Sequence, residues 1–482
     1  MRILEIIVFL RLGKFQIMIG RIKEINELQQ CYQSNRSEFV IIYGRRRVGK
    51  TYLVHELFEK EFAFHYVGAH HLAKDKQLPN FARSLQTFSG SPFLPACKNW
   101  FEAFNFLQDY LTSLQTKTKK VVFFDEMPWI DTPKSEFVAA LENFWNGWAM
   151  HQKDILFIAS GSATSWMADK LIDNQGGLHN RITQKIYLRP FTLGEVESYL
   201  EAAGCSWDRY QILQCYMIFG GIPFYLSLLN PKQSLVQNVD TLFFAPNAAM
   251  RDEFSELYNA LFSNADHYIN IVRALNSKKE GLTRTEIAQM TNIQGSTLTK
   301  MLSNLCKCDF VTTYAHYGKT VKNVIYRLAD FYTLFYFKYV ENDLSKDENR
   351  WTHLIHTQQV VAWQGLTFEL VCLQHLPQIK KGLGIAGVLT SASSWRSENA
   401  QIDLLIDRDD RIINLCEMKF SQEPYAISAE YANKIRMRSA LFREATKCKK
   451  GLVNTFVTTY GILPGKNSSV AESELTMEAL FE

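Results

Sequence analysis

Residues 44–51 constrain the fold of this chain more than any other feature. They read Gly-Arg-Arg-Arg-Val-Gly-Lys-Thr and match the pattern G-x-x-x-x-G-K-[ST] at every specified position. An apolar run at residues 39–43 precedes them, and a helix is predicted at residues 52–60. A strand, a glycine-rich turn and a helix in this order predict a phosphate-binding loop (P-loop). A chance match in an ordinary turn would not explain the flanking strand and helix.

The residue types in this loop suit a nucleotide with Mg²⁺. Glycines let backbone N–H groups turn toward phosphates, and the following helix adds the positive end of its dipole. Lys50 can reach the β- and γ-phosphates, and the Thr51 hydroxyl can ligate Mg²⁺. We therefore expect ATP and Mg²⁺ as cofactors. The nucleotide-binding residues expected from the loop are Gly44, Arg45, Arg46, Arg47, Val48, Gly49, Lys50 and Thr51.

Further polar residues follow the apolar runs downstream of the loop. Asp125 and Glu126 end the run at 121–124, so Asp125 would hold Mg²⁺ through water and Glu126 would polarise the attacking water. For an isolated Asp-Glu pair the alternative is a solvated helix start, but the P-loop favours the catalytic interpretation. Ser162 would lie beside the γ-phosphate, or in an ordinary turn or helix cap. Arg181 is either a surface charge or a group that reaches the nucleotide of a neighbouring subunit.

The chain is too long, at 482 residues, for one ordinary core. Between residues 38 and 188, short apolar runs alternate with helical stretches, which indicates an α/β fold with a parallel sheet covered on both faces. A polar segment at residues 341–350 is typical of a boundary loop. The expected domains are the nucleotide-binding core at 18–190, a strandless helical region at 191–264, a module of three helices and a two-stranded ribbon at 265–340, and a last domain at 350–482.

The residues of the first two domains resemble an AAA+ ATPase, in particular the archaeal and bacterial ATPases with a C-terminal domain of formerly unknown function. This resemblance covers nearly the whole chain after Met18. It implies the strand order 5-1-4-3-2, a helical lid, Arg21 near the adenine, Ser162 as a first sensor and Arg181 as an arginine finger between subunits of a homo-oligomer. Pro223 would pack on the base. A second-sensor arginine is not evident in the lid. The resemblance rests on Ile19, Gly20, Arg21, the P-loop, Asp125, Glu126, Ser162, Arg181, Gly221, Ile222 and Pro223.

Residues 265–340 resemble a winged helix-turn-helix. Thr283 and Glu286 open the second helix with a capping-box pattern. The alternative to DNA binding is a module that docks against the ATPase core, because the third helix carries few basic residues. If the module binds DNA, the groups facing the major groove would be Ser296, Thr297, Thr299 and Lys300, with Lys319 and Lys322 on the wing.

A hairpin near the C-terminus brings carboxylates together. If its turn centres between Asp409 and Asp410, Asp403 lies opposite Cys416 or Glu417, and Glu417 shares a face with Lys419. Because burying unpaired charges is costly, a divalent metal is a natural partner. A salt-bridged hairpin is the alternative.

This set resembles the core of PD-(D/E)XK nucleases, although Ile402 stands where the family name has proline. The resemblance implies Mg²⁺ on Asp403 and Glu417, with Glu369 as the additional helical glutamate and Lys419 orienting water or stabilising the phosphorane. A basic stretch follows and suits phosphate contacts, or is simply a solvated helix. Its cations, against the single acid Glu444, are Lys434, Arg436, Arg438, Arg443, Lys447, Lys449 and Lys450.

Composition limits the classes of function. With 47% hydrophobic and 21% charged residues, the chain has the composition of a soluble globular protein, and we expect it in the cytoplasm without membrane contact. The apolar run at residues 3–10 is too short to span a bilayer, and we expect the natural start at Met18. The nine cysteines lack zinc-site spacing and are expected to be reduced thiols. The net charge of +4 is too small to indicate nucleic acid by itself.

Two functions follow. The first is an ATPase coupled to DNA binding and metal-dependent DNA cleavage. The alternative is a nucleotide-controlled switch whose C-terminal domain binds DNA or protein without cleaving.

Overall fold

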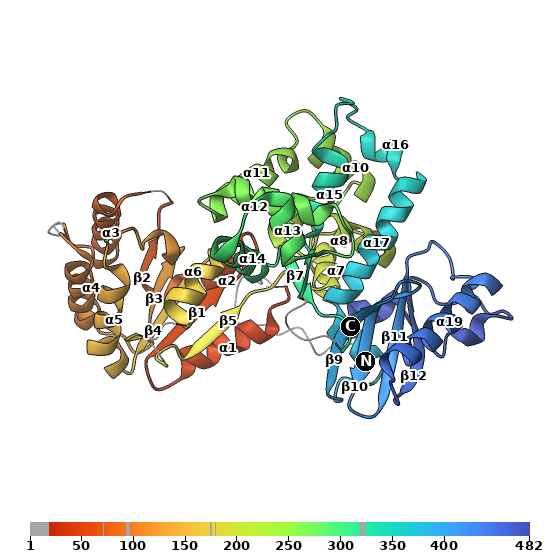
Figure 1. The fold of residues 1–482 in the computed structure, drawn as a ribbon. Helices are drawn as coiled ribbons and strands as arrows, with labels where there is room; N and C mark the ends of the chain where they lie inside the picture. Colours follow the sequence, from red (N-terminus) through yellow and green to blue (C-terminus); the bar gives the residue numbers. More distant parts are fainter. Residues whose placement is uncertain (1–18, 71, 93–96, 174–175, 179, 319–323) are drawn as a thin grey trace. The chain divides into compact units, whose positions relative to one another are not determined.

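The computed structural model describes residues 19–70, 72–92, 97–173, 176–178, 180–318 and 324–482. It divides into two compact units, one ending at Arg189 and the other beginning at Pro190 (Figure 1). None of the helices in these residues has the length and apolar composition to cross a membrane. All nine cysteines lie in the described segments, and none forms a disulfide.

The first unit is built on one sheet of five parallel strands. Its order is β2-β3-β4-β1-β5, with every neighbouring pair parallel. The predicted order 5-1-4-3-2 is the same order read from the other edge, so this prediction is confirmed. The strands are β1 (Glu38–Tyr43), β2 (Phe62–Val67), β3 (Lys120–Asp125), β4 (Ile155–Gly161) and β5 (Gln184–Tyr187).

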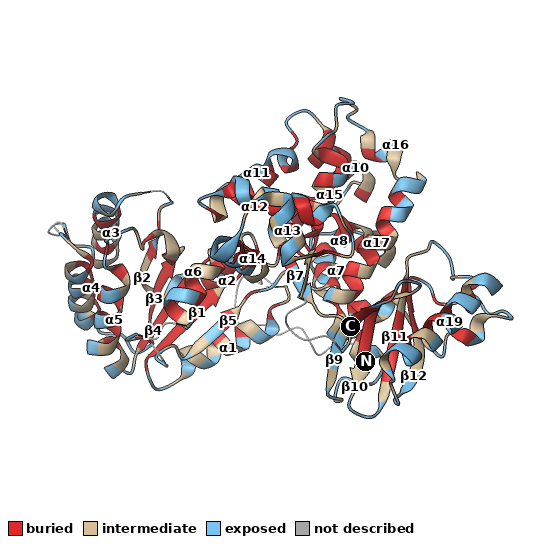
Figure 2. Cartoon of the chain, viewed as in Figure 1, coloured by how far each residue is buried: buried red, intermediate tan, exposed pale blue. Residues whose placement is uncertain are grey.

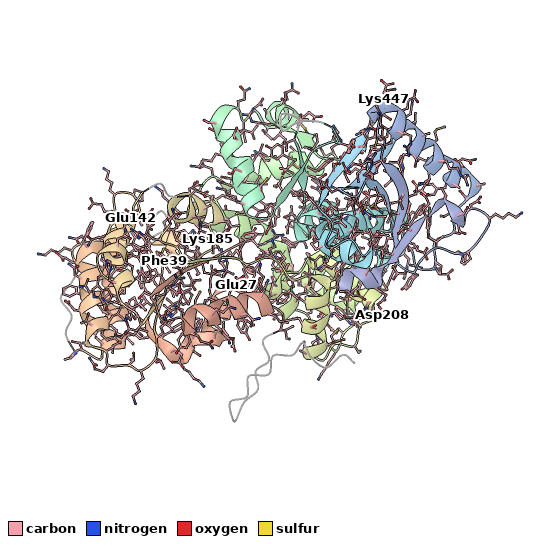
Figure 3. All side chains as sticks on the ribbon, turned by 90° about the horizontal axis from the view of Figure 1, so that it is seen from below. Glu27, Phe39, Glu142, Lys185, Asp208 and Lys447 are labelled. Carbon is pink, nitrogen blue, oxygen red and sulfur yellow. The ribbon has the colours of Figure 1, made fainter. Side chains whose placement is uncertain are left out.

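Helices cover this sheet because its inner strands are apolar on both faces. Alternate strand residues such as Phe39, Phe124 and Phe157 join an aromatic core with α3, α4 and α5 (Figure 2). Figure 3 shows Phe39 inside the packed interior, and its ring contacts those of Trp145 and Phe157. The helices are α1 (Ile22–Gln33), α2 (Lys50–Phe58), α3 (Lys74–Ser89), α4 (Trp100–Ser113), α5 (Phe137–Gly147) and the short α6 (Thr164–Trp166).

The second unit begins with the strandless helical region that the sequence predicts. Capping boxes at Thr192, Asp208 and Ser234 start three of its helices, because each side chain accepts a hydrogen bond from an otherwise unpaired N–H group. This region belongs to the same compact unit as the C-terminal part of the chain. Its helices are α7 (Leu193–Ala202), α8 (Arg209–Phe219), α9 (Pro223–Ser227), α10 (Leu235–Val239) and α11 (Ala249–Leu261).

A module of three helices and a small antiparallel sheet follows. The predicted ribbon gains a third strand, because Leu282 and Thr283 pair with Tyr326 and Ile325. The capping box of Thr283 and Glu286 is present. The elements are α12 (Ala265–Asn276), β6 (Leu282–Thr283), α13 (Arg284–Thr291), α14 (Gly295–Lys307), β7 (Val311–Tyr314) and β8 (Ile325–Leu328), with strand order β6-β8-β7.

A mixed five-stranded sheet completes the second unit. Its order is β13-β12-β11-β10-β9; β9, β10 and β11 are antiparallel neighbours, and β11, β12 and β13 are parallel. The sequence predicted only the β10–β11 hairpin. The elements are α15 (Phe331–Phe335), α16 (Arg350–Leu354), α17 (Gln358–Gln374), α18 (Leu376–Gly382), β9 (Thr390–Arg396), β10 (Gln401–Arg408), β11 (Ile412–Lys419), α19 (Ala429–Thr446), β12 (Gly451–Thr458) and β13 (Ser473–Thr476).

Candidate functional site

The P-loop joins the carboxyl end of β1 to the amino end of α2. At Gly44, φ is 147° and a Cβ atom would overlap the carbonyl oxygen of Leu188, so only glycine fits. Gly49 has φ 91°, which also favours glycine. Because α2 begins at Lys50, the positive end of its dipole lies at the loop. The backbone therefore has the form that phosphate binding requires.

Two basic side chains define the shape of the loop. Lys50 Nζ donates to the carbonyl oxygens of Gly44 and Arg45, 3.0 Å from each, so its ammonium group lies inside the loop. The buried Arg21 donates from Nη2 to the carbonyl oxygen of Val48 at 3.2 Å. The N-terminal segment is thus tied directly to the loop, while contact between Arg21 and an adenine stays a prediction.

The two expected Mg²⁺ ligands lie one hydrogen bond apart. Thr51 Oγ1 donates to Asp125 Oδ2 at 2.7 Å. Asp125 Oδ1 accepts from the Ser160 hydroxyl and from the backbone N–H of Glu126. A hydroxyl and a buried carboxylate are oxygen ligands of the kind that Mg²⁺ prefers, so these residues fit the ion. Sequence reasoning missed Ser160, although its place at the carboxyl end of β4, two residues before Ser162, could have indicated it.

Glu126 is held by the end of the neighbouring strand. Both the backbone N–H and the hydroxyl of Ser162 donate to Glu126 Oε2, at 3.1 and 2.8 Å. Because both bonds fall on Oε2, the other oxygen, Oε1, is the one that can accept a proton from water. Glu126 also has φ 47°, an unusual backbone conformation for this residue type. The structure therefore brings Ser162 to the predicted catalytic carboxylate.

The nucleotide-site roles expected of Arg46, Arg47, Arg181 and Pro223 stay predictions. Arg181 lies in an exposed turn before β5. Pro223 begins α9, in the second unit. Arg46 and Arg47 lie at the turn of the P-loop, where Arg47 adopts φ 74°.

The second candidate site is the β10–β11 hairpin, whose predicted register is confirmed. Leu404 pairs with Cys416 and Asp407 with Ile413, and Asp403 lies in a β-bulge of β10 between Ile402 and Leu405. Glu417 and Lys419 share a face, as the alternation predicts, whereas the bulge interrupts the alternation at Asp403.

The carboxylate of Glu417 is already engaged by protein groups. Lys419 Nζ lies 2.9 Å from Glu417 Oε1, which also accepts from the Tyr431 hydroxyl, and Arg438 Nη1 donates to Oε2. Burial would raise the pKa of Glu417, but the charges of Arg438 and Lys419 outweigh it and lower the pKa to about 2. Both oxygens thus face cations of the chain itself.

Glu369, on α17, lies near Asp403 but has a different environment. Burial and the Asp403 charge raise the pKa of Glu369 to about 7, while Arg327 opposes this from 4.0 Å. Within the described residues, no three His, Cys, Asp or Glu side chains form a group that could hold a metal ion. As placed, Glu369, Asp403 and Glu417 do not fit the predicted Mg²⁺, and their metal role stays a prediction.

The basic stretch after the hairpin differs from the expectation at one important residue. Arg438 was predicted to belong to a phosphate-binding patch, but its side chain is buried and paired with Glu417. The reason is that α19 turns this residue toward β11. Lys450 is also engaged, since its Nζ lies 2.6 Å from Asp407 Oδ1. The exposed members of the patch are Lys434, Arg436, Arg443, Lys447 and Lys449.

The predicted DNA-facing residues of α14 share one exposed face. Ser296, Thr297, Thr299 and Lys300 are all exposed. The Thr299 hydroxyl accepts a hydrogen bond from Arg284 Nε at 3.1 Å. Lys319 and Lys322, predicted on the wing, lie outside the described residues.

The first candidate site lies in the part of the chain that is similar to known ATPases. Residues 18–229 match the model of an "ATPase domain predominantly from Archaea". An uncharacterized protein of Methanocaldococcus jannaschii, MJECL04, is 24% identical over 401 residues, which cover 82% of this chain and 85% of the relative. In the same organism, the uncharacterized ATP-binding protein MJ0423 is 36% identical over 45 residues, 9% of this chain and 76% of the relative.

Among solved structures, the Walker-type ATPase PABY2304 of Pyrococcus abyssi is 17% identical with a TM-score of 0.46, and the match covers 66% of this chain and 96% of that one. The family model spans both the P-loop and the Asp125–Glu126 pair. Residues 18–229 are therefore an ATPase domain of this predominantly archaeal family.

Proposed function

We propose that this chain is an AAA+-type ATPase that acts as a nucleotide-controlled switch, and that its second unit binds DNA without cutting it. The ATPase part rests mainly on one observation: the pairs Thr51–Asp125 and Ser162–Glu126 lie side by side at the carboxyl ends of β3 and β4. This arrangement provides ligands for Mg²⁺ beside a carboxylate that can activate water.

Each residue has a distinct role in hydrolysis. Lys50 and the amino end of α2 offset the phosphate charge. Thr51 and Asp125 would hold Mg²⁺, which neutralises charge on the phosphates when bound. Glu126 Oε1 accepts the proton of the attacking water, while Ser162 fixes the carboxylate through Oε2. Ser160 keeps Asp125 oriented.

The pairing of Glu417 favours a switch over a nuclease. A carboxylate that is bound by an arginine, a lysine and a tyrosine hydroxyl must break these bonds before it can ligate an ion. The rival proposal, metal-dependent DNA cleavage, is supported by the nearness of Asp403 to Glu369 and of Lys419 to Glu417.

Two substitutions test the ATPase mechanism. Lys50→Ala should abolish ATP binding, because it removes the ammonium group inside the loop. Glu126→Gln should keep ATP binding and lose hydrolysis, because only water activation is removed. Binding is measured with a fluorescent ATP analogue and hydrolysis by phosphate release. Equal nucleotide affinity in wild type and Lys50→Ala would refute the site.

Incubation with DNA separates the switch from the nuclease. Purified full-length protein is mixed with single-stranded, duplex and branched DNA and with Mg²⁺ or Mn²⁺, with and without ATP. The switch predicts ATP-dependent binding and intact DNA. Cleavage that is lost in Asp403→Ala, Glu417→Ala and Lys419→Ala, with ATP hydrolysis kept, would establish the nuclease instead.

A further inference from the structure

We propose that a pocket in the second unit binds one nucleotide of a single-stranded nucleic acid, with the base inside and the phosphate at the rim. This inference rests on the DNA binding proposed above and specifies the form of nucleic acid that is bound. The pocket encloses about 370 Å³, at the small end of the range for ligand sites, roughly 300–1,000 Å³. It has room for one nucleotide, whereas a duplex cannot enter.

Two modules of the second unit form the walls, and backbone hydrogen bonds join them. The segment after β7 lies along the edge strand β9, where Tyr317 N donates to Ser394 O at 2.7 Å. The His316 ring nitrogen Nδ1 and the Ser394 hydroxyl are 3.0 Å apart. The Tyr317 ring packs against Phe442. The module at residues 265–340 is therefore docked on the C-terminal sheet, and the walls of the pocket are held together.

Charges of both signs line the pocket, and they include Glu280, Glu286 and the Lys278 that pairs with Glu286. Lys279 and Arg396 line the pocket from different modules, and both are exposed. Deeper in the pocket, the side chains of Glu369 and Arg327 are only 18% and 13% exposed. Asp403, half-buried, lines the same pocket. Asp403 and the ionised form of Glu369 repel a phosphate and accept hydrogen bonds from the N–H groups of a base, while the exposed Lys279 and Arg396 attract a phosphate. The two exposed cations favour a nucleotide whose phosphate lies at the rim and whose base points inward.

The remaining interior suits the flat face and polar edge of a base. Trp395 and Tyr314 contribute aromatic surface, and Leu373 and Leu376 contribute apolar surface. The Ser393 hydroxyl is buried and has no hydrogen-bond partner among the described residues. Aromatic and apolar walls with a few polar groups are typical of pockets that hold a single unstacked base.

Fluorescence anisotropy with the full-length chain tests this proposal. The probes are short labelled oligo-dC, oligo-dT and a blunt duplex of equal length, at one fixed salt concentration. We expect oligo-dC to bind more tightly than the duplex. It should also bind more tightly than oligo-dT, because the exocyclic amine of cytosine donates to a carboxylate, whereas the single N3–H donor of thymine lies between two carbonyl oxygens that a carboxylate repels.

Substitutions of the rim cations Lys279 and Arg396 test the proposed phosphate contacts. The double variant Lys279→Glu/Arg396→Glu should weaken oligo-dC binding by about tenfold or more, because two phosphate contacts become repulsive. The neutral double variant Lys279→Gln/Arg396→Gln should weaken oligo-dC binding less. Lys279→Arg, which keeps the positive charge, should bind oligo-dC as wild type does. Lys466→Glu reverses the charge of a single exposed lysine outside the pocket, the same exchange as at Lys279, and serves as the control. Thermal unfolding verifies that each variant is folded.

The outcomes distinguish failure of the pocket proposal from failure of the proposed DNA binding. If oligo-dC binds but the rim variants bind it as wild type does, the pocket proposal is wrong. Preferential duplex binding that is lost in Lys300→Glu, on the exposed face of α14, would also overturn it while DNA binding stands. If no nucleic acid binds with or without ATP, the proposed DNA binding fails as well.

Discussion

The ion pair between Glu417 and Arg438 decides how the C-terminal hairpin can act. Arg438 is buried, and its Nε and Nη2 atoms find no hydrogen-bond partner in the described part of the chain. Its charge is offset mainly by Glu417, because the two side chains are in direct contact. Removing one member of such a buried pair leaves the other charge uncompensated.

Glu417→Gln tests this pairing. A carboxylate whose pKa falls on folding, here from 4.5 to about 2, stabilises the fold above pH 4.5, and the contribution is lost as the pH falls toward 2. We expect the variant to lower the unfolding free energy of the second unit by about 3 kcal/mol at pH 7. The deficit should shrink toward pH 2. Urea unfolding measures it, with the exposed Glu423→Gln as control. The same loss at pH 7 and near pH 2 would contradict the ion-pair explanation.

His375 gives the second unit a pH dependence in a different range. Its Nε2 accepts from Leu193 N at 3.0 Å, and its Nδ1 lies 2.8 Å from the carbonyl oxygen of Val371, so the neutral ring satisfies both contacts. Burial lowers the pKa of His375 from 6.5 to about 4. The contribution of the neutral ring is therefore complete above pH 6.5 and is lost as the pH falls to 4.

We expect the unfolding free energy of the second unit to fall by up to about 3 kcal/mol between pH 6.5 and pH 4. His375→Gln should flatten this slope, whatever its effect at pH 7, because it removes the titrating group. The exposed His356→Gln should keep the slope. Urea unfolding at several pH values measures it, and an unchanged slope in His375→Gln would assign the acid sensitivity to other groups.

At the scale of elements, close backbone approaches fix how segments join. After α8 the chain passes Gly221, whose carbonyl oxygen accepts from Phe191 N at 2.6 Å. A Cβ atom at this position would overlap the backbone of Phe191. The junction between the start of the second unit and α9 therefore requires glycine. The close approach of the Phe191 backbone therefore explains why residue 221 is glycine, and no contact with a nucleotide is needed.

Two glycine-to-alanine substitutions should change the stability of the second unit in opposite directions. Gly221→Ala should lower the melting temperature of the second unit, because the new methyl group meets backbone atoms that cannot move independently. Gly365→Ala, inside α17 with open space around it, should stabilise by about 1 kcal/mol through helix propensity. Calorimetry on both variants measures the shifts. Stabilisation by Gly221→Ala would show that the junction is not tight.

At the scale of the whole molecule, the helical region after Pro190 belongs to the second compact unit, and its role as a lid stays a prediction. The expectation of a homo-oligomer rests on Arg181, which is exposed just before β5.

Arg181→Ala should depress hydrolysis by roughly 10³-fold or more if the side chain acts as an arginine finger, and should leave ATP binding unchanged. Mixing it with Glu126→Gln should restore part of the activity, because a shared site would combine one intact residue from each protein. Lys185→Ala removes another exposed cation nearby, labelled in Figure 3, and is the control. Full hydrolysis by an Arg181→Ala monomer would refute the arginine-finger role of Arg181.

The sequence alone determined the nucleotide site, because its information is local. The P-loop spacing, the apolar runs and the carboxylates after residue 124 predicted the parallel sheet and the neighbourhood of Lys50, Thr51 and Asp125, and the AAA+ resemblance that these residues carry implied the strand order. The hairpin register also followed from residues adjacent along the chain. Short-range patterns suffice here, since parallel strands place their carboxyl ends at one edge of the sheet.

Only the tertiary structure decided the partners of the second unit. Arg438 follows Glu417 by 21 residues, and its burial depends on how α19 packs on β11. The pocket joins residues 278–286 to residues 392–404, through the pairing of Tyr317 with the edge strand β9. A charge pattern in the sequence gives the same signal for an exposed cation and a buried one. Which of them binds a ligand is set by desolvation, and desolvation depends on contacts between segments far apart in the chain.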